Sequence, residues 1–217
     1  PGLQQYDNYK YAVHTRSGKV LAKADPYAFH AETRPGTASK LYDLSGYQWG
    51  DGSWLDYRKN NPVYQKPMNI YEVHLGSWHT NPDDPNGWYN YEEIAQRLIP
   101  YVKEAGFNYI ELMPLSEHPS DASWGYQNTG FFSPTSRYGT PQQLMTLVDR
   151  CHQADIGVIL DFVPVHFAVD DYALWNYDGT PLYEYPSWDV GRSEWGSCNF
   201  MHSRGEIRCF LQSCADY

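Results

Sequence analysis

The chain has 217 residues, a length that suits one or two domains with a sizeable core. Its formal net charge of −10 at pH 7 makes the phosphate surface of a nucleic acid an unfavourable partner, and no apolar run has the length of a membrane span. Aromatic residues are abundant, with 20 Tyr and 8 Trp. Such rings stack on sugar rings, but they also serve in ordinary packing, so composition alone leaves both uses open.

The four cysteines do not follow the spacing of a zinc site, and no secretory signal precedes them. Cys151, Cys209 and Cys214 lie in segments with a helical pattern, where a free cysteine behaves as a small apolar residue. We therefore expect reduced thiols, no bound metal and a cytoplasmic location. The chain begins with Pro-Gly rather than Met and stops inside an apparent helix, which is typical of a piece of a longer protein.

The first part of the chain predicts short strands. Residues 9–13 alternate in polarity, residues 16–19 supply a turn, and residues 20–22 form a second strand that runs back along the first. This stretch therefore predicts a hairpin. Pro and Gly then mark loops, and an Asn-Asn-Pro run indicates a linker. We expect one domain over residues 1–62 and a second over residues 63–217.

A different pattern begins after the linker. Residues 69–74 predict a first strand, and residues 109–113 predict a second. Between them Asn90 and Glu93 form a capping box that predicts the start of a helix. Pro100 lies inside this helical pattern, so we expect a kink or a break in the hydrogen-bond ladder there.

The same alternation continues to the end of the chain. Thr140 and Gln143 predict a second helix start, residues 157–162 predict a third strand, and Ser203 with Glu206 predicts the cap of a last helix. The order β-α-β-α-β-α implies parallel strands with right-handed crossovers. A Rossmann-type sheet is disfavoured because no Gly-rich phosphate loop follows the first strand, and three units are too few to close an eight-stranded barrel.

Several polar side chains follow these strands closely. Asp161 lies in the apolar run of the third strand, so we expect its carboxylate to be desolvated, and His166 follows shortly after it. Trp124 and Tyr126 could form a platform for a sugar, with Gln127 bonding a hydroxyl, although aromatic loop packing explains this motif better when it is taken alone. Other residues near the strand ends are better explained as caps or supporting groups: Glu72, His74, Glu111, Glu117 and His118.

Residues 161–166 (DFVPVH) resemble the first characteristic region of the α-amylase superfamily of glycoside hydrolases. Residues 23–29 (KADPYAF) are similar to the end of an N-terminal starch-binding-like β-sandwich found in part of that superfamily. Three further segments, in the family's order and spacing, narrow the resemblance to the bacterial glycogen (1,4-α-glucan) branching enzymes: residues 70–78 (IYEVHLGSW), 113–119 (MPLSEHP) and 123–127 (SWGYQ). Each of these three segments, like residues 161–166, is only moderately specific. The four together, in the family's order, are strong support for the resemblance.

The resemblance implies an α/β chain. Residues 63–217 would form the first three units of a (β/α)8 TIM barrel, preceded in residues 1–62 by the C-terminal part of a β-sandwich. It also implies a transferase of glycogen biosynthesis that cuts an α-1,4 glucan, holds it covalently and passes it to a 6-hydroxyl. The implied partners are α-glucan and the C-terminal remainder of the same protein, with no cofactor, metal, nucleic acid or membrane.

The resemblance also implies roles for single residues. Tyr126 would stack on the sugar at the cleavage point, His166 would hydrogen-bond one of its hydroxyls, and Asp161 would help to order the site. Gln127 belongs to the form of this loop typical of branching enzymes, and we expect Trp124 to be a further substrate contact. In the family the nucleophile, the acid/base and the third carboxylate come from strands four, five and seven. We therefore expect no catalytic residue in this chain and no activity from it alone.

Two other functions are open at this stage. A debranching enzyme or a trehalose-releasing hydrolase has a similar N-terminal half. The reaction product of such an enzyme depends on whether water or a sugar hydroxyl reaches the covalent intermediate. A non-catalytic glucan-binding module would use the aromatic residues without turnover.

Overall fold

The computed structural model describes residues 2–217, which form two compact units. The chain passes between the units more than once. The first unit contains residues 2–43, 116–136 and 162–217, and the second contains residues 44–115 and 137–161. None of the helices in the described residues combines the length and the apolar character needed to cross a membrane.

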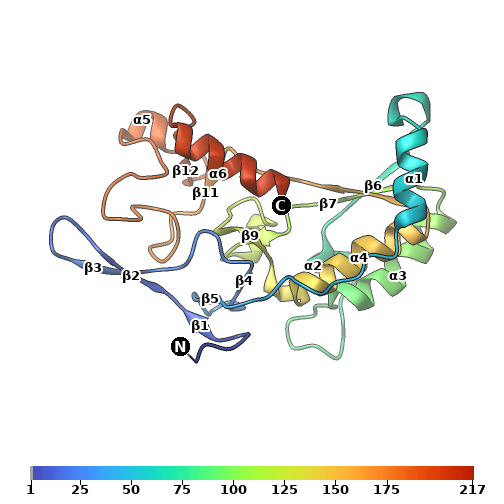
Figure 1. Ribbon diagram of the computed structural model, residues 1–217, viewed down its shortest axis with the longest axis horizontal. Coiled ribbons are helices and arrows are strands. Elements are labelled where there is room, and N and C mark those ends of the chain that lie inside the picture. Colours follow the sequence, from blue (N-terminus) through green and yellow to red (C-terminus); the bar gives the residue numbers. More distant parts are fainter. Residues whose placement is uncertain (1) are drawn as a thin grey trace. The chain divides into compact units, whose positions relative to one another are not determined.

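A parallel sheet forms the centre of the second unit. Its strands are β6 (Ile70–Val73), β7 (Tyr109–Leu112) and β10 (Gly157–Leu160), labelled in part in Figure 1, and β7 lies between the other two. Ile110 of β7 is opposite Tyr71 on one side and Val158 on the other. The alternating order predicted for this stretch is confirmed, and the third strand ends two residues earlier than expected.

Helix α3 (Tyr91–Glu104) begins at the predicted capping box. The Asn90 side chain accepts a hydrogen bond of 2.9 Å from the Glu93 N–H, and the Glu93 carboxylate accepts one of 2.9 Å from the Asn90 N–H. These bonds satisfy donors that a helix start otherwise leaves unpaired. The helix continues through Pro100 to its last residue, so the proline does not break it.

Helix α4 (Pro141–Gln153) also begins as predicted. Thr140 accepts a 3.3 Å hydrogen bond from the Gln143 N–H, and the Gln143 side chain returns one of 2.9 Å to the Thr140 N–H. Helices α3 and α4 lie side by side, as Figure 1 shows in green and yellow.

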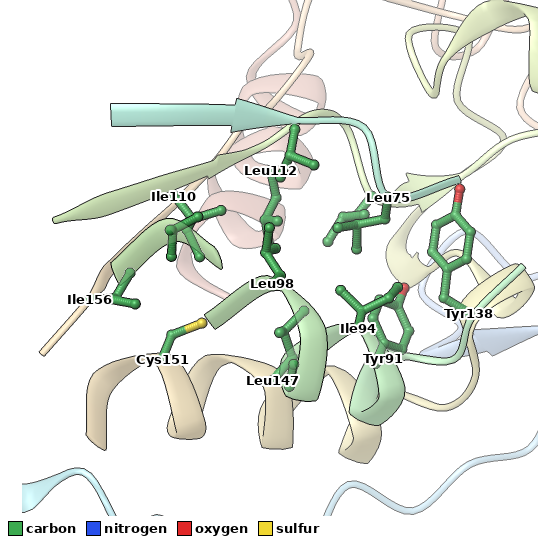
Figure 2. Packing of buried hydrophobic residues seen from close by; sticks show 14 residues of the cluster. Leu75, Tyr91, Ile94, Leu98, Ile110, Leu112, Tyr138, Leu147, Cys151 and Ile156 are labelled. Carbon is green, nitrogen blue, oxygen red and sulfur yellow. The ribbon is translucent and has the colours of Figure 1, made fainter. Parts of the chain in front are cut away.

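The two helices and the sheet enclose the core of the second unit. Figure 2 shows Leu98 of α3, Ile110 of β7 and Leu147 of α4 pointing toward one another. Leu98 is 0% exposed, and its two neighbours are 1% exposed. The apolar side chains of the two helices, spaced at the 3.6-residue period, are therefore the ones that pack against the sheet.

Helix α1 (Gly52–Asn60) is a difference from the sequence prediction, which has a loop and a linker there. Long-range contacts within the unit hold it in place. Asp51, directly before the helix, lies 2.8 Å from the ring nitrogen of His152 on α4, and the Trp54 indole stacks on the same imidazole at 5.2 Å. Tertiary contacts of this kind override weak local preference.

The first unit consists mainly of short antiparallel pairs. The predicted hairpin is confirmed as β2 (Tyr11–His14) and β3 (Val20–Lys23), drawn in blue in Figure 1. The other strands are β1 (Asn8–Tyr9), β4 (His30–Ala31) and β5 (Ser39–Lys40) in one sheet, β8 (Ser116–Glu117) with β9 (Gly130–Pro134), and β11 (His166–Phe167) with β12 (Cys198–Asn199). The β-sandwich and the domain boundary after residue 62 stay predictions.

The last helix differs from its prediction at the N-terminus. Helix α6 (Gly205–Asp216) is preceded by Arg204, and no side chain caps it, so the cap expected from Ser203 and Glu206 is wrong. Its apolar face is buried, because Ile207, Phe210, Leu211 and Cys214 all join the buried cluster of this unit. The remaining short helices are η1 (Val63–Gln65), α2 (Leu75–Trp78), η2 (Asp121–Ser123), η3 (Ser136–Tyr138) and α5 (Trp188–Gly191).

A buried ammonium group joins the hairpin to a later loop of the same unit. The Lys23 Nζ donates to the carbonyl oxygens of Asp171 at 2.6 Å and Trp175 at 2.7 Å, and burial lowers the pKa of this lysine. The Ala24 N–H donates to the Tyr172 carbonyl at 2.7 Å. The segment that follows β3 is thereby fixed to residues 171–175.

All four cysteines are free thiols. Cys151 is buried in the core of the second unit, whereas Cys198 and Cys214 are buried in the cluster of the first. Burial raises the pKa of Cys151 and of Cys214 to about 12, so neither is a reactive thiolate at neutral pH. Cys209 is exposed on α6.

The core of the second unit predicts unequal costs for two leucine truncations in helices. Leu98→Ala should lower the free energy of unfolding by about 3 kcal/mol, because it removes buried methyl groups and leaves a cavity. Leu55→Ala on α1, where the side chain is 44% exposed, should change it by less than about 0.5 kcal/mol. Urea denaturation of the two variants measures both values, and equal losses would contradict this packing.

A buried histidine predicts acid sensitivity in the first unit. Burial, with a smaller contribution from Lys40, lowers the pKa of His30 to about 4, and its ring lies between those of Tyr6 and Tyr42. Because the unfolded chain binds this proton more readily, stability should fall as pH drops from about 6.5 toward 4, on the order of 2 kcal/mol.

His30→Phe should flatten this difference when unfolding is measured in urea at pH 7 and pH 4.5. The same substitution at the exposed His14 controls for the loss of a histidine in general. Parallel pH dependence of the parent and the His30→Phe variant would contradict the assignment.

Candidate functional site

His166 is the most deeply buried of the candidate site residues. It lies on β11, opposite Asn199 of β12, and it is 7% exposed. Its Nδ1 has no hydrogen-bond partner among the described residues, and burial lowers the pKa of the ring. The imidazole is therefore neutral at pH 7, and one of its ring nitrogens is buried without a hydrogen-bond partner among the described residues.

An exposed indole lies next to this imidazole. The ring centroids of His166 and Trp195 are 5.9 Å apart, and the ring planes are inclined by 31°. Trp195 is not among the residues that the sequence pattern predicts for the site. The sequence around Trp195 shows only a tryptophan within a turn of Ser and Gly residues. Its candidate role depends on the contact with His166, which is distant in the sequence.

Gln127 is hydrogen-bonded to the segment that carries Trp195. Its Nε2 donates a hydrogen bond of 3.2 Å to the Trp195 carbonyl oxygen. The next residue, Asn128, accepts a 2.9 Å hydrogen bond from the N–H of Ala168, two residues after His166. These bonds bring Gln127, His166 and Trp195 together within the first unit.

The loop before Gln127 carries the other two predicted aromatic residues. The Trp124 N–H donates to the Asp121 carbonyl, its φ is +54°, and its side chain is 56% exposed. Tyr126 is half-buried, and its N–H donates to the Ser123 carbonyl at 3.0 Å. The Asp121 carboxylate also pairs with the Arg34 guanidinium. The loop is thus a hydrogen-bonded turn rather than a free segment.

Asp161 differs from its prediction. Strand β10 ends at Leu160, whose side chain is 54% exposed, so Asp161 lies just beyond the strand and is only half-buried. Its predicted position inside the strand is therefore wrong, and the desolvation of its carboxylate stays a prediction. Its N–H donates to the Leu112 carbonyl at 3.0 Å, within the second unit.

The Glu117 carboxylate is hydrogen-bonded to several donors of the protein itself. It accepts hydrogen bonds from the Ser136 N–H at 2.8 Å, the Ser136 hydroxyl at 2.9 Å, the Thr135 hydroxyl at 3.2 Å and the His118 N–H at 3.1 Å. A buried carboxylate with this many donors fixes a loop, which agrees with the supporting role expected for it. Within residues 2–217, no three His, Cys, Asp or Glu side chains are gathered so that they could hold a metal ion.

Comparisons with known proteins give a consistent result. A family model described as alpha amylase, catalytic domain, matches residues 80–183. The crystal structure of a putative alpha amylase from Salmonella typhimurium matches with a TM-score of 0.75 and 22% identity, covering 98% of this chain and 32% of that one. The chain therefore has an α/β fold of the α-amylase type.

The similarity to individual relatives is closer. The chain is 50% identical over 218 residues to the 1,4-alpha-glucan branching enzyme GlgB of Bacillus subtilis, covering 100% of the chain and 34% of that protein. It is 52% identical over 208 residues to the enzyme of the same name from Geobacillus stearothermophilus, covering 95% of the chain and 32% of the relative. The resemblance to bacterial branching enzymes is confirmed over the whole chain, which spans about a third of the length of these relatives.

The role of Glu117 is open to a direct test. Glu117→Ala should lower the free energy of unfolding by about 3 kcal/mol, because four donors lose their acceptor in a buried place. Glu194→Ala, an exposed carboxylate of the same unit, should cost less than about 0.5 kcal/mol. Denaturation curves measure both. Unchanged stability with lost activity would instead make Glu117 a reacting group.

Proposed function

We propose that this chain is part of a 1,4-α-glucan branching enzyme, which cleaves an α-1,4 glucan and joins the released segment to a 6-hydroxyl as an α-1,6 branch. The observation that carries the proposal is the 50% identity to the Bacillus subtilis enzyme across the whole chain. The neutral, buried imidazole of His166, whose Nδ1 has no hydrogen-bond partner among the described residues, supports an uncharged polyhydroxyl substrate.

The finer architecture belongs to the same proposal. Strands β6, β7 and β10 would be the first three strands of a (β/α)8 barrel, since they are parallel and lie side by side in the sheet in the order in which they occur along the chain. Residues 1–62 would be the C-terminal part of a β-sandwich, with the barrel following from residue 63. The hairpin β2–β3 and the sheet of β1, β4 and β5 support a β-rich first domain.

The substrate contacts follow from the site residues. Tyr126 would stack on the glucose at the cleavage point, Trp124 would contact the neighbouring part of the glucan, and His166 would hydrogen-bond a hydroxyl through Nδ1. Gln127 and Asp161 would help to order the site. These groups bind and orient the sugar, which is a prerequisite for reaction at its anomeric carbon.

Bond cleavage would be a double displacement. One carboxylate attacks the anomeric carbon while an acid protonates the leaving oxygen, and a sugar 6-hydroxyl then displaces the enzyme from the covalent intermediate. The family resemblance assigns these carboxylates to strands four, five and seven, whereas the described parallel sheet contains three strands. None of the carboxylates described above is therefore given that role.

The proposal predicts the products of the full-length protein. Incubated with amylose, it should shift the iodine complex to shorter wavelength, and a debranching enzyme should release new short chains from the product. A polypeptide limited to these 217 residues should do neither, because the reacting carboxylates are supplied elsewhere. New reducing ends without α-1,6 linkages would point to a hydrolase and overturn the proposal.

A further inference from the structure

Trp195 is held at the tip of a tight, well-bonded turn. The Gly196 N–H donates to the Ser193 carbonyl at 3.0 Å, and the Ser193 N–H donates to the Ser197 carbonyl at 2.9 Å. The two serine hydroxyls lie 3.1 Å apart, and Gly196 adopts a φ of +80°, which a residue with a side chain rarely does. The backbone of Trp195 is consequently fixed, although its side chain is not packed away.

The exposure of this indole is a cost that packing does not explain. Trp195 is 65% exposed, yet it lies against the nearly buried ring of His166. A large apolar ring that is rigidly presented to solvent beside a neutral hydrogen-bonding group has the composition of a sugar-binding surface. The apolar face of a pyranose stacks on the indole, and a ring nitrogen bonds one of its hydroxyls.

The unused nitrogen of His166 is the second, independent observation. Nδ1 is buried and has no hydrogen-bond partner among residues 2–217, which is unusual for a polar atom in a folded protein. A hydroxyl of a bound glucose would satisfy it. Because the imidazole is neutral at pH 7, it can accept or donate this bond without the desolvation of an ion.

Gln127 supports the backbone of Trp195 from a distant part of the sequence. Its amide nitrogen is committed to the Trp195 carbonyl oxygen at 3.2 Å. Arg192 also donates to the same turn, from its guanidinium to the Gly196 carbonyl at 3.4 Å. Gln127 can therefore fix the position of the turn. The turn then determines where the indole lies relative to His166.

We propose that Trp195 is the stacking surface of a glucose-binding subsite next to His166, and that Gln127 is a positioning residue for Trp195. The ligand is a glucose unit of an α-glucan chain, so the proposal rests on the proposed function. The subsite adds a contact that none of Trp124, Tyr126 and Asp161 provides.

The test is steady-state kinetics of the full-length protein with amylose, together with maltoheptaose binding followed by tryptophan fluorescence. Trp195→Ala should raise KM about tenfold with little change in kcat, since stacking contributes mainly to binding. Trp195→Phe should keep KM within about threefold of the parent, because a ring remains. Gln127→Met, which keeps the length but removes the donor, should raise KM about threefold with kcat retained.

Trp188→Ala is the matched control, because this indole is 77% exposed in the same unit and has no ring contact with His166 among the described residues. It should leave KM and the fluorescence response unchanged. Equal KM values for the parent and Trp195→Ala would overturn the subsite, as would a loss confined to kcat. Retained KM in Gln127→Met would overturn the positioning role.

The two proposals fail separately. If the parent makes α-1,6 branches while Trp195→Ala keeps its KM, the subsite is wrong and the function stands. If the parent makes no branches but Trp195→Ala loses the maltoheptaose response, the function is wrong and the subsite stands. Thermal melting of each variant, with Trp195→Phe as the conservative comparison, separates loss of binding from loss of folding.

Discussion

The parallel pairing of β7 with both of its neighbours is the constraint on which the second unit depends. Because the three strands run in one direction, their C-terminal ends lie along one edge of the sheet. Two chain segments that leave this edge, after β7 and after β10, continue into residues 116–136 and 162–217 of the first unit. The packing of α3 and α4 on the sheet buries the residues that fix its strand order.

Local signals predicted the structure well where the stabilising contacts are themselves local. The caps at Asn90 and Thr140 lie within three residues of their partners, so the sequence alone identifies them. Helix α1 was missed because its support comes from His152, about a hundred positions away. The cap expected at Ser203 failed because the helix starts after Arg204 instead, without any side-chain cap.

The candidate site shows the same division. His166 and Tyr126 lie in segments whose sequences resemble motifs of a known family. Trp195 becomes a candidate only when the structure pairs β12 with β11. The side chains of Gln127, His166 and Trp195 are neutral although the chain has a net charge of −10. A site of this kind matches an uncharged polyhydroxyl ligand, because no ion has to give up its hydration when the ligand binds.

The four thiols have a practical consequence for following how the molecule opens. Cys151 and Cys214 are buried in different units, and each becomes accessible to an alkylating reagent only when its own unit opens. Cys209, already at the surface, reports the intrinsic speed of the reagent under the same conditions. The order in which mass spectrometry finds the two buried positions modified, at rising denaturant, would reveal whether the units unfold together or one after the other.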